Sequence, residues 1–146
     1  MFNRVLAVCV GNVCRSPMAA ALLADHLGEE RGIVVHSAGL GALIGCPADE
    51  MAQALMRDRG IDLSRHRARQ LTPAMVLDYD LILVKETSHI KAIEAMQPSA
   101  HGRVYRLGHW SDVEIPDPYQ KSITEFENTL ELIDRSLMDW RIKFWS

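Results

Sequence analysis

VLAVCVGNVCRSPMAAALLADHL, residues 5–27, is the stretch that decides the expected fold of this chain. It opens with an apolar run typical of a buried strand and ends in an Ala/Leu-rich segment typical of a helix. We predict the strand at residues 4–9 and the helix at 17–27, with Ser16 as its N-cap and Pro17 in its first turn. The loop between them then presents backbone N–H groups at the positive end of a helix, which is an expected anion site.

A thiol and a guanidinium stand at the two ends of this loop, because Cys9 and Arg15 have five residues between them. A helix N-terminus and a nearby cation favour a thiolate, and Arg can grip two phosphoryl oxygens through its planar fork. We expect Gly11 to allow positive φ, Asn12 to tolerate the left-handed region and lock the loop, and Ser16 to donate a hydrogen bond to the sulfur. We interpret the loop as a nucleophile inside an anion cradle, in preference to a buried structural thiol at a strand end.

A second segment, IPDPY at residues 115–119, supplies a candidate acid. A thiolate that attacks a phosphate ester needs a proton donor for the leaving oxygen. Prolines on both sides of Asp117 restrict its backbone and would hold its carboxyl in a fixed pose. Tyr119 offers an aromatic wall for an aryl substrate. Alone, an Asp-Pro pair indicates a simple turn, so the weight of this segment comes from its pairing with the Cys9 loop.

Strand-like and helix-like segments alternate along the rest of the chain. We predict strands at 33–37, 79–84 and 103–107, helices at 49–59, 88–96 and from 123 onward, and helix stops at Gly28 and Gly60. Such alternation is typical of an α/β fold, here a single domain over residues 1–146 with a parallel sheet covered by helices on both faces. Ligands of such sheets bind beyond the carboxyl ends of the strands, which is where the Cys9 loop lies.

The last helix has the clearest pattern. Ser122 and Glu125 have capping-box spacing. Apolar residues recur at steps of three and four on one face, namely Ile123, Phe126, Leu130, Ile133, Leu137, Trp140 and Phe144. Coiled-coil pairing is the alternative, but about three heptads are marginal for it. We therefore expect this helix to dock on the sheet.

Composition narrows the function classes. The formal net charge is −3, the pI is near 6.0 and 48% of the residues are hydrophobic, so we expect neither nucleic-acid binding nor membrane insertion. Residues 1–4 lead straight into the first strand and leave no room for a secretory signal. Three cysteines are too few for a disulfide scaffold. We expect a cytoplasmic location, and no metal, because no histidine stands at a metal-ligand spacing.

At this point a family resemblance can be stated. CVGNVCRSP at 9–17 together with DPY at 117–119 resembles the low-molecular-weight protein tyrosine phosphatases. SAGLG at 37–41, HRARQ at 66–70 and DLIL at 80–83 agree, so the resemblance covers essentially the full chain. It implies a four-stranded parallel sheet in the order 2-1-3-4, with the phosphate-binding loop after strand 1.

Two further segments resemble one branch of this family. LGAL at 40–43 and GHW at 108–110 are similar to the bacterial phosphatases that serve capsule and exopolysaccharide production. That branch is paired with autophosphorylating tyrosine kinases, so the resemblance implies a tyrosine-phosphorylated protein as substrate, with the cognate kinase as the expected one. It also implies a monomer or weak homo-oligomer, and no cofactor.

The resemblance implies a role for each site residue. Cys9 is the nucleophile that forms a phosphocysteine, Asp117 protonates the leaving phenolate and then activates water, and Ser16 stabilises the thiolate. The phosphate is bound by Arg15 and by the loop, which comprises Val10, Gly11, Asn12, Val13, Cys14, Arg15 and Ser16. Asn12, Ser37 and His66 brace the loop. Leu40 and Tyr119 border the substrate entrance.

The side chains of Cys14, Cys46 and Lys85 lie outside the roles given above. Cys14 is close enough to Cys9 for the reversible disulfide that serves this family as a redox brake, but it is equally interpretable as a small packed residue. Cys46 matches no motif and is interpreted as structural or incidental. Relatives usually carry an apolar residue and then Glu after strand three, whereas here Lys85 precedes Glu86. We expect Lys85 to alter packing or surface charge near the site without touching a catalytic role.

Three rival functions fit the residues less well. A protein arginine phosphatase on the same fold typically has Thr where this chain has Val13, whose methyl groups suit an aromatic ring. A thioredoxin-coupled arsenate reductase needs two further relay cysteines, and Cys46 alone cannot supply both. A non-catalytic phosphoprotein-binding module would be free to lose Cys9 or Asp117, and both are present. The physiological phosphoprotein stays open.

Overall fold

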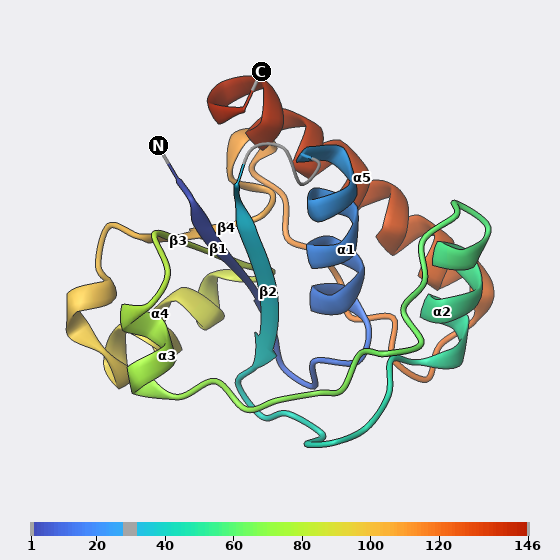
Figure 1. Cartoon of the computed structure of the whole chain (residues 1–146), viewed down its shortest axis with the longest axis horizontal. Coiled ribbons are helices and arrows are strands. Elements are labelled where there is room, and N and C mark those ends of the chain that lie inside the picture. Colours follow the sequence, from blue (N-terminus) through green and yellow to red (C-terminus); the bar gives the residue numbers. More distant parts are fainter. Residues whose placement is uncertain (1, 28–31, 146) are drawn as a thin grey trace.

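The computed structural model describes residues 2–27 and 32–145, and its centre is one parallel sheet (Figure 1). The strands are β1 Arg4–Cys9, β2 Val34–Gly39, β3 Leu81–Val84 and β4 Val104–Arg106. They lie in the order β2-β1-β3-β4, and each neighbouring pair is parallel. The predicted strand order and orientation are therefore confirmed.

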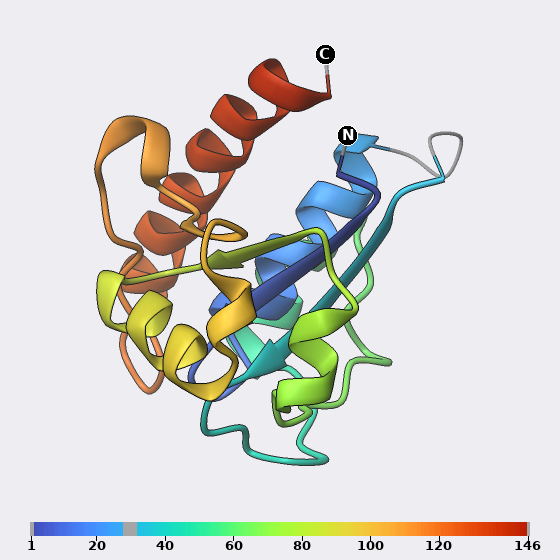
Figure 2. The same ribbon diagram turned by 90° about the vertical axis from the view of Figure 1, so that its left-hand side faces the viewer.

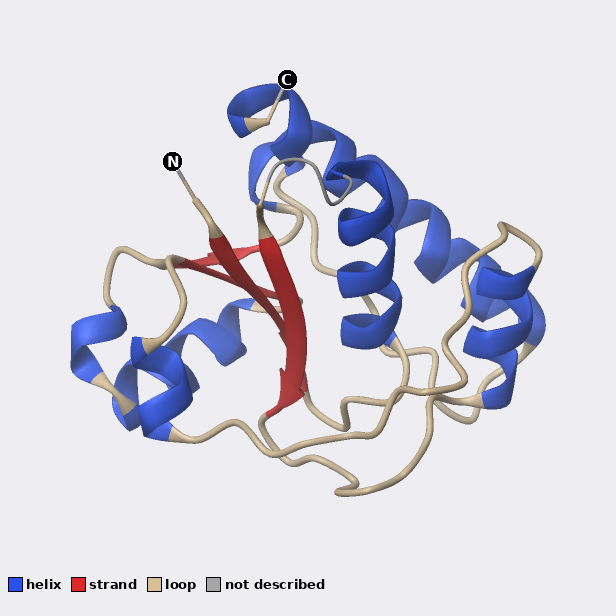
Figure 3. Cartoon of the chain, viewed as in Figure 1, coloured by secondary structure: helices blue, strands red, loops and turns tan. Residues whose placement is uncertain are grey.

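Helices cover both faces of the sheet (Figures 1 and 3). They are α1 Arg15–Leu27, α2 Glu50–Arg57, α3 Pro73–Leu77, α4 Thr87–Met96 and α5 Ile123–Phe144. Short 3₁₀ turns occur at Pro98–Ala100 and His109–Ser111. In Figure 2, α3 and α4 lie in front of the sheet, with α1 behind it. The predicted two-sided cover is confirmed.

The alternation of side chains along the strands builds one apolar layer on each face. On one side, Val5 and Ala7 of β1 join α1 and α5 in the larger core. On the other, Leu6 and Val8 of β1 join residues of α3 and α4. All six residues of β1 except Arg4 are buried, which explains why this strand has the continuous apolar sequence of a central parallel strand.

The start of α1 differs from the prediction. The helix begins at Arg15, two residues early, and the Cys14 carbonyl accepts its first bond from the Met18 N–H at 3.2 Å. Ser16 is therefore not the N-cap. The residue lies inside the first turn, where its hydroxyl is free to contact the site. The predicted stop at Gly28 lies outside the described residues.

Three other segments were missed or had different bounds. The helix α3 was not predicted, since five residues are too few for a helical period; its signals are Thr72, whose hydroxyl accepts the Met75 N–H, and the proline that follows. β2 extends to Gly39, beyond the predicted end at residue 37, because its last residues pair with β1 up to Cys9. The helix predicted at 49–59 ends at Arg57, with Asp49 as its N-cap.

The last helix matches its prediction except at Ile123, which is 43% exposed. The Ser122 hydroxyl accepts the Glu125 N–H at 3.3 Å. The apolar face enters the same core as α1, through buried Phe126, Leu130, Ile133, Leu137 and Trp140. The docked helix is therefore confirmed over the coiled-coil alternative. Among the described helices, none is long and apolar enough to cross a membrane.

Gly39 joins the end of β2 to the loop that follows β1. A methyl group at Gly39 would collide with the carbonyl oxygen of Val10 and would press on Asn12. A methyl group at Gly41 would meet only the Val10 side chain, at an ordinary 3.7 Å.

We therefore predict that Gly39→Ala lowers the free energy of unfolding by ~1–3 kcal/mol, as overpacking against backbone does. Urea denaturation followed by fluorescence measures it. The matched control Gly41→Ala should stay within ~0.5 kcal/mol of wild type. Equal stability of the two variants would contradict the close contact between β2 and the loop.

Candidate active site

The loop from Cys9 to Cys14 has its carbonyl groups bound from outside. The carbonyls of Cys9, Val10 and Gly11 accept the N–H groups of Leu40, Gly41 and Leu43 at 2.9, 3.0 and 3.1 Å. The Val13 carbonyl accepts the Asp49 N–H at 2.9 Å. In a trans peptide the carbonyl and the following N–H point in opposite directions. The N–H groups of residues 10–15 are therefore directed away from these partners, toward the inside of the loop.

Asn12 fixes the curvature of the loop. It is fully buried and has a φ of 61°, in the left-handed region that Asn tolerates. Its side-chain amide donates to the hydroxyls of Ser16 at 2.8 Å and Ser37 at 3.0 Å, and its Oδ1 accepts the Arg69 N–H at 2.9 Å. The predicted left-handed tolerance and bracing role of Asn12 agree with this geometry.

His66 supports the loop from a third segment. Its Nε2 donates to the Asn12 carbonyl at 2.7 Å. Burial lowers the pKa of His66, and the charges of Arg67 and Arg69 lower it further, against the opposing effect of the bond to Asn12. The imidazole is therefore neutral at neutral pH, with its proton on Nε2. Ser37 and His66 both contact Asn12, where the sequence placed them.

Gly11 behaves differently from the prediction. Asn12, and not Gly11, is the loop residue with positive φ. A methyl group at Gly11 would meet only Val13 and Leu43, at ordinary distances. The left-handed residue was placed correctly at Asn12, so the glycine is not needed for the turn itself.

The nucleophile candidate, Cys9, is buried at the end of β1 and contacts Ser16. The Cys9 Sγ and the Ser16 Oγ are 2.9 Å apart. Because the Ser16 oxygen already accepts a bond from Asn12, its own proton is available for the sulfur. The predicted contact between Ser16 and Cys9 is present.

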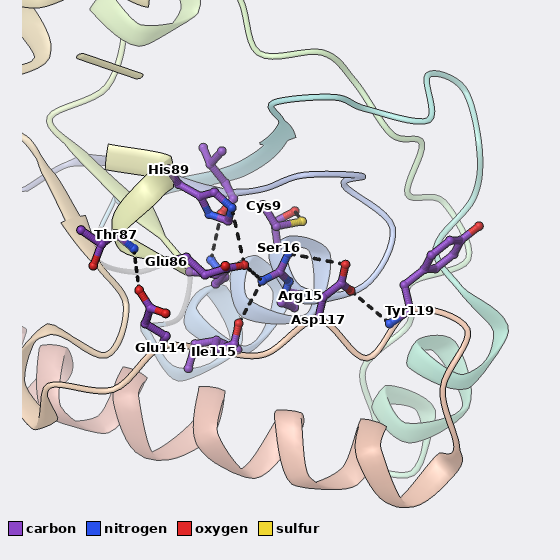
Figure 4. A network of polar contacts seen from close by, with 12 residues as sticks. Cys9, Arg15, Ser16, Glu86, Thr87, His89, Glu114, Ile115, Asp117 and Tyr119 are labelled. Atoms are coloured by element: carbon purple, nitrogen blue, oxygen red, sulfur yellow. Dashed lines mark hydrogen bonds and ion pairs between the residues drawn. The ribbon is translucent and has the colours of Figure 1, made fainter. Parts of the chain in front are cut away.

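Arg15 enters the site from the first turn of α1 and is held by two groups (Figure 4). It is only 2% exposed. One guanidinium nitrogen donates to Glu86 at 2.8 Å and to the Ile115 carbonyl at 2.9 Å. The other lies 3.7 Å from an Asp117 oxygen. This grip sets the plane of the guanidinium before any anion binds.

Asp117 lies between Arg15 and the entrance of the site (Figure 4). Its Oδ1 accepts the Tyr119 N–H at 3.0 Å, which fixes the carboxyl in an Asx turn. The Asp117 side chain is 51% exposed, so it can reach both a bound ester and water. Tyr119 is 39% exposed beside it.

These elements surround a cavity of about 190 Å³. It is lined by Cys9, Val10, Gly11, Asn12, Val13, Cys14, Arg15, Gly41, Leu43, Asp117 and Tyr119. The structure thus brings together the loop and the distant Asp-Pro-Tyr segment, as predicted. Leu40 does not line this cavity, because it packs against the core on the α3 side of the sheet. Leu43 takes the place at the entrance that was predicted for Leu40.

Glu86 is the main site residue that the sequence did not identify. It follows β3, whose carboxyl end lies beside that of β1, and it holds Arg15 as an ion pair. The available signal was an acidic residue directly after a neighbouring parallel strand. The buried His89 lies next to it, with Nε2 3.6 Å from the Glu86 carboxylate. Burial lowers the pKa of His89.

Lys85 was expected to alter either packing or surface charge near the site. The residue has 0% of its surface exposed, so the expectation of altered surface charge is wrong. Its Nζ lies 3.3 Å from the Leu83 carbonyl and 3.4 Å from the Val8 carbonyl, directly before Cys9. Burial lowers the pKa of Lys85 to about 7; the charge of Cys9 raises this pKa and that of Arg15 lowers it.

The other cysteines occupy different environments. Cys14 is buried, and burial raises the pKa of its thiol, as do the charges of Asp49, Asp117 and Cys9. Both Cys9 and Cys14 are free thiols, so the two interpretations of Cys14 stay open. Cys46 is exposed on the loop before α2. Over residues 2–27 and 32–145, the structure brings no three acidic, His or Cys side chains together as a metal site.

The arrangement can do a defined chemistry. Six inward N–H groups and a fixed guanidinium can bind a tetrahedral anion. A sulfur nucleophile lies at the base of the same cavity, and a half-exposed carboxyl lies at its rim. Nucleophile, oxyanion donors and acid therefore meet around one point, as displacement at phosphorus requires.

Comparison with known proteins agrees with this geometry. The family model described as low molecular weight phosphotyrosine protein phosphatase matches residues 4–143. The probable low molecular weight protein-tyrosine-phosphatase EpsP of Ralstonia nicotianae is 47% identical over 140 residues, which are 96% of this chain and 94% of that protein. The phosphatase Wzb of Salmonella typhimurium is 45% identical over 141 residues, covering 96% and 93% of the two chains.

A solved structure extends the likeness to the whole fold. Vibrio vulnificus Wzb, in complex with benzylphosphonate, superposes with a TM-score of 0.93 at 39% identity, over 99% of this chain and 100% of that one. Sequence, fold and site geometry therefore lead to the same conclusion: the chain belongs to the low molecular weight protein-tyrosine-phosphatase family.

Proposed function

We propose that this protein-tyrosine phosphatase works through a phosphocysteine intermediate formed on Cys9. The thiolate attacks phosphorus while the N–H groups of residues 10–15 and Arg15 bind the phosphoryl oxygens. Asp117 gives its proton to the leaving phenolate, then takes one from the water that cleaves the S–P bond. The observation that carries the proposal is the single cavity shared by Cys9, Arg15 and Asp117.

The shape of the cavity supports an aryl phosphate. Val13 and Leu43 present methyl groups to it, and Tyr119 presents a ring at its mouth. None of these three side chains carries a cation or a carboxylate that would favour a guanidinium substrate. The benzylphosphonate bound to Vibrio vulnificus Wzb carries an aromatic ring on a phosphonate, which supports the same class of ligand here.

We further propose a protein substrate, with a bacterial autophosphorylating tyrosine kinase of capsule or exopolysaccharide synthesis as the cognate one. Support comes from the segments at 40–43 and 108–110 and from the similarity to EpsP and Wzb. Val10, Leu43 and Ile44 expose apolar surface near the cavity, as a site that receives a protein segment would. A reducing, cytoplasmic compartment would keep Cys9 and Cys14 as the free thiols seen here.

Variants at the two reacting groups test the mechanism. Cys9→Ser should lose nearly all hydrolysis of p-nitrophenyl phosphate, because the hydroxyl is a far poorer nucleophile. Asp117→Asn should lower kcat by ~10²–10⁴-fold, the usual contribution of a general acid. Asp112→Asn, an exposed carboxylate outside the cavity, is the matched control and should keep wild-type rates. Wild-type activity in the Cys9 or Asp117 variant would reject these roles.

Substrate preference tests the argument from Val13. Phosphotyrosine peptides should be hydrolysed far faster than phosphoarginine peptides of the same sequence, because methyl groups line the cavity. Val13→Thr should reduce the ratio of the phosphotyrosine rate to the phosphoarginine rate, because it adds a hydroxyl partner for the guanidinium. Phosphate release from both peptides, compared as kcat/KM, measures it. The reverse order in the wild type would show that the apolar lining does not set the specificity.

A trapping variant tests the partner. Asp117→Ala keeps Cys9 and Arg15 but lacks the acid, so it should hold tyrosine-phosphorylated proteins longer than wild type. Affinity capture from cells of the source organism, with elution by vanadate, should recover an autophosphorylating tyrosine kinase. The double variant Cys9→Ser, Arg15→Ala is the control for binding outside the cavity. Recovery of tyrosine-phosphorylated proteins that include no kinase would contradict the proposed partner.

A further inference from the structure

Lys85 is a buried cation that the mechanism above does not use. It follows β3, and its side chain lies under the start of the phosphate-binding loop, within reach of the Val8 carbonyl. Its two hydrogen-bond acceptors, on Val8 and Leu83, are neutral carbonyl groups. Its own carbonyl accepts the Ile115 N–H at 3.0 Å, so the backbone at this position is tied to the segment that carries Asp117.

A buried ammonium is costly unless an anion lies near it. Within the described part of the chain, no carboxylate lies within ion-pair distance of the Lys85 Nζ. Glu86, its neighbour in sequence, is engaged with Arg15. Glu114, from the segment before Asp117, accepts the Thr87 N–H instead.

The remaining nearby group that can carry a negative charge is the thiol of Cys9. Three ionisable groups interact with Lys85 through charge, namely Cys9 from the end of β1, Arg15 from α1 and His89 from α4. Arg15 repels an ammonium, and His89 has its own pKa lowered by burial, so neither compensates Lys85. Cys9 is the one of the three whose charge favours the protonated lysine.

We propose that Lys85 is a positioning residue for the nucleophile: its buried ammonium keeps Cys9 as a thiolate and stabilises the same sulfur as a leaving group. This inference rests on the proposed role of Cys9. In the first step the S–P bond forms, the bond from phosphorus to the phenolic oxygen breaks and Asp117 gives up its proton. In the second, water oxygen bonds phosphorus, the electron pair of the S–P bond returns to sulfur and Asp117 recovers a proton.

Lys85 is not needed for proton transfer in these two steps, because Asp117 both supplies and recovers the proton. Ser16 contacts the sulfur from the helix side, as a neutral donor. The charge of Arg15 is partly offset by Glu86 and is directed to the phosphoryl oxygens. Protonated Lys85 therefore adds positive charge under the start of the loop, next to the Val8 carbonyl.

The pH dependence of Cys9 alkylation tests the inference without turnover. Iodoacetamide is neutral, so its rate of reaction reports the fraction of thiol present as thiolate. Fragment mass spectra distinguish Cys9 from Cys14, and a Cys46→Ser background removes the exposed thiol.

Lys85→Met matches the length of lysine without its charge, and Lys85→Gln keeps a hydrogen-bond donor. In both, the midpoint of the alkylation profile should rise by about one pH unit, as loss of a nearby opposite charge does. The kcat/KM for p-nitrophenyl phosphate below that midpoint should fall about tenfold.

The control is Lys91→Met, which removes an exposed lysine from α4 and should leave the profile unchanged. Unchanged midpoints in both Lys85 variants, with urea curves that show folded protein, would overturn the inference and leave a packing role. A shift in Lys85→Met but not in Lys85→Gln would overturn it as well, because hydrogen bonding and not charge would then be responsible. Full activity in Cys9→Ser would instead reject the proposed function, whatever the Lys85 variants show.

Discussion

The carbonyl groups from Cys9 to Cys14 are all committed to partners outside the cavity, and the chemistry of the site depends on this constraint. Each bound carbonyl fixes one peptide plane, and each plane directs the next N–H inward. Asn12 makes the turn possible, since its left-handed backbone reverses the chain while its side chain satisfies three partners. The loop therefore has its binding geometry before an anion arrives, and no reorganisation is needed when charge develops.

The parallel sheet determines which charged residues lie around the loop. Carboxyl ends of β1 and β3 meet at one edge, so Cys9, Lys85 and Glu86 are neighbours although 75 residues separate the first from the second in sequence. Glu86 holds Arg15 in a partly buried ion pair that orients the guanidinium, and the cost of desolvating Arg15 offsets part of the attraction between the two charges. The buried Lys85 side chain lies under the start of the same loop, with its Nζ 3.4 Å from the Val8 carbonyl.

How far the sequence predicts this structure depends on the range of the interactions. The strands, the helix from Ile123 and the Cys9–Arg15 loop depend on local patterns, and they were predicted within a few residues. The helix α3 was missed because five residues carry no period, and Ser16 was misplaced because Cys14 already provides the first helical acceptor. Glu86 and Leu43 were missed since their places depend on the register between distant segments. The sequence shows Lys85 in a place where relatives usually have an apolar residue, but only the packing of β3 against β1 shows that this lysine is buried.

The contacts that hold the loop have a consequence for how such a site diversifies. Leu40, Gly41, Leu43 and Asp49 hold it through their backbone N–H groups, which every residue except proline possesses. Most side chains in the stretch 40–49 can thus change without removing the main-chain hydrogen bonds that hold the phosphate-binding loop. Substitutions in this stretch can therefore change which phosphoproteins bind during evolution, while the catalytic loop and its reaction stay the same.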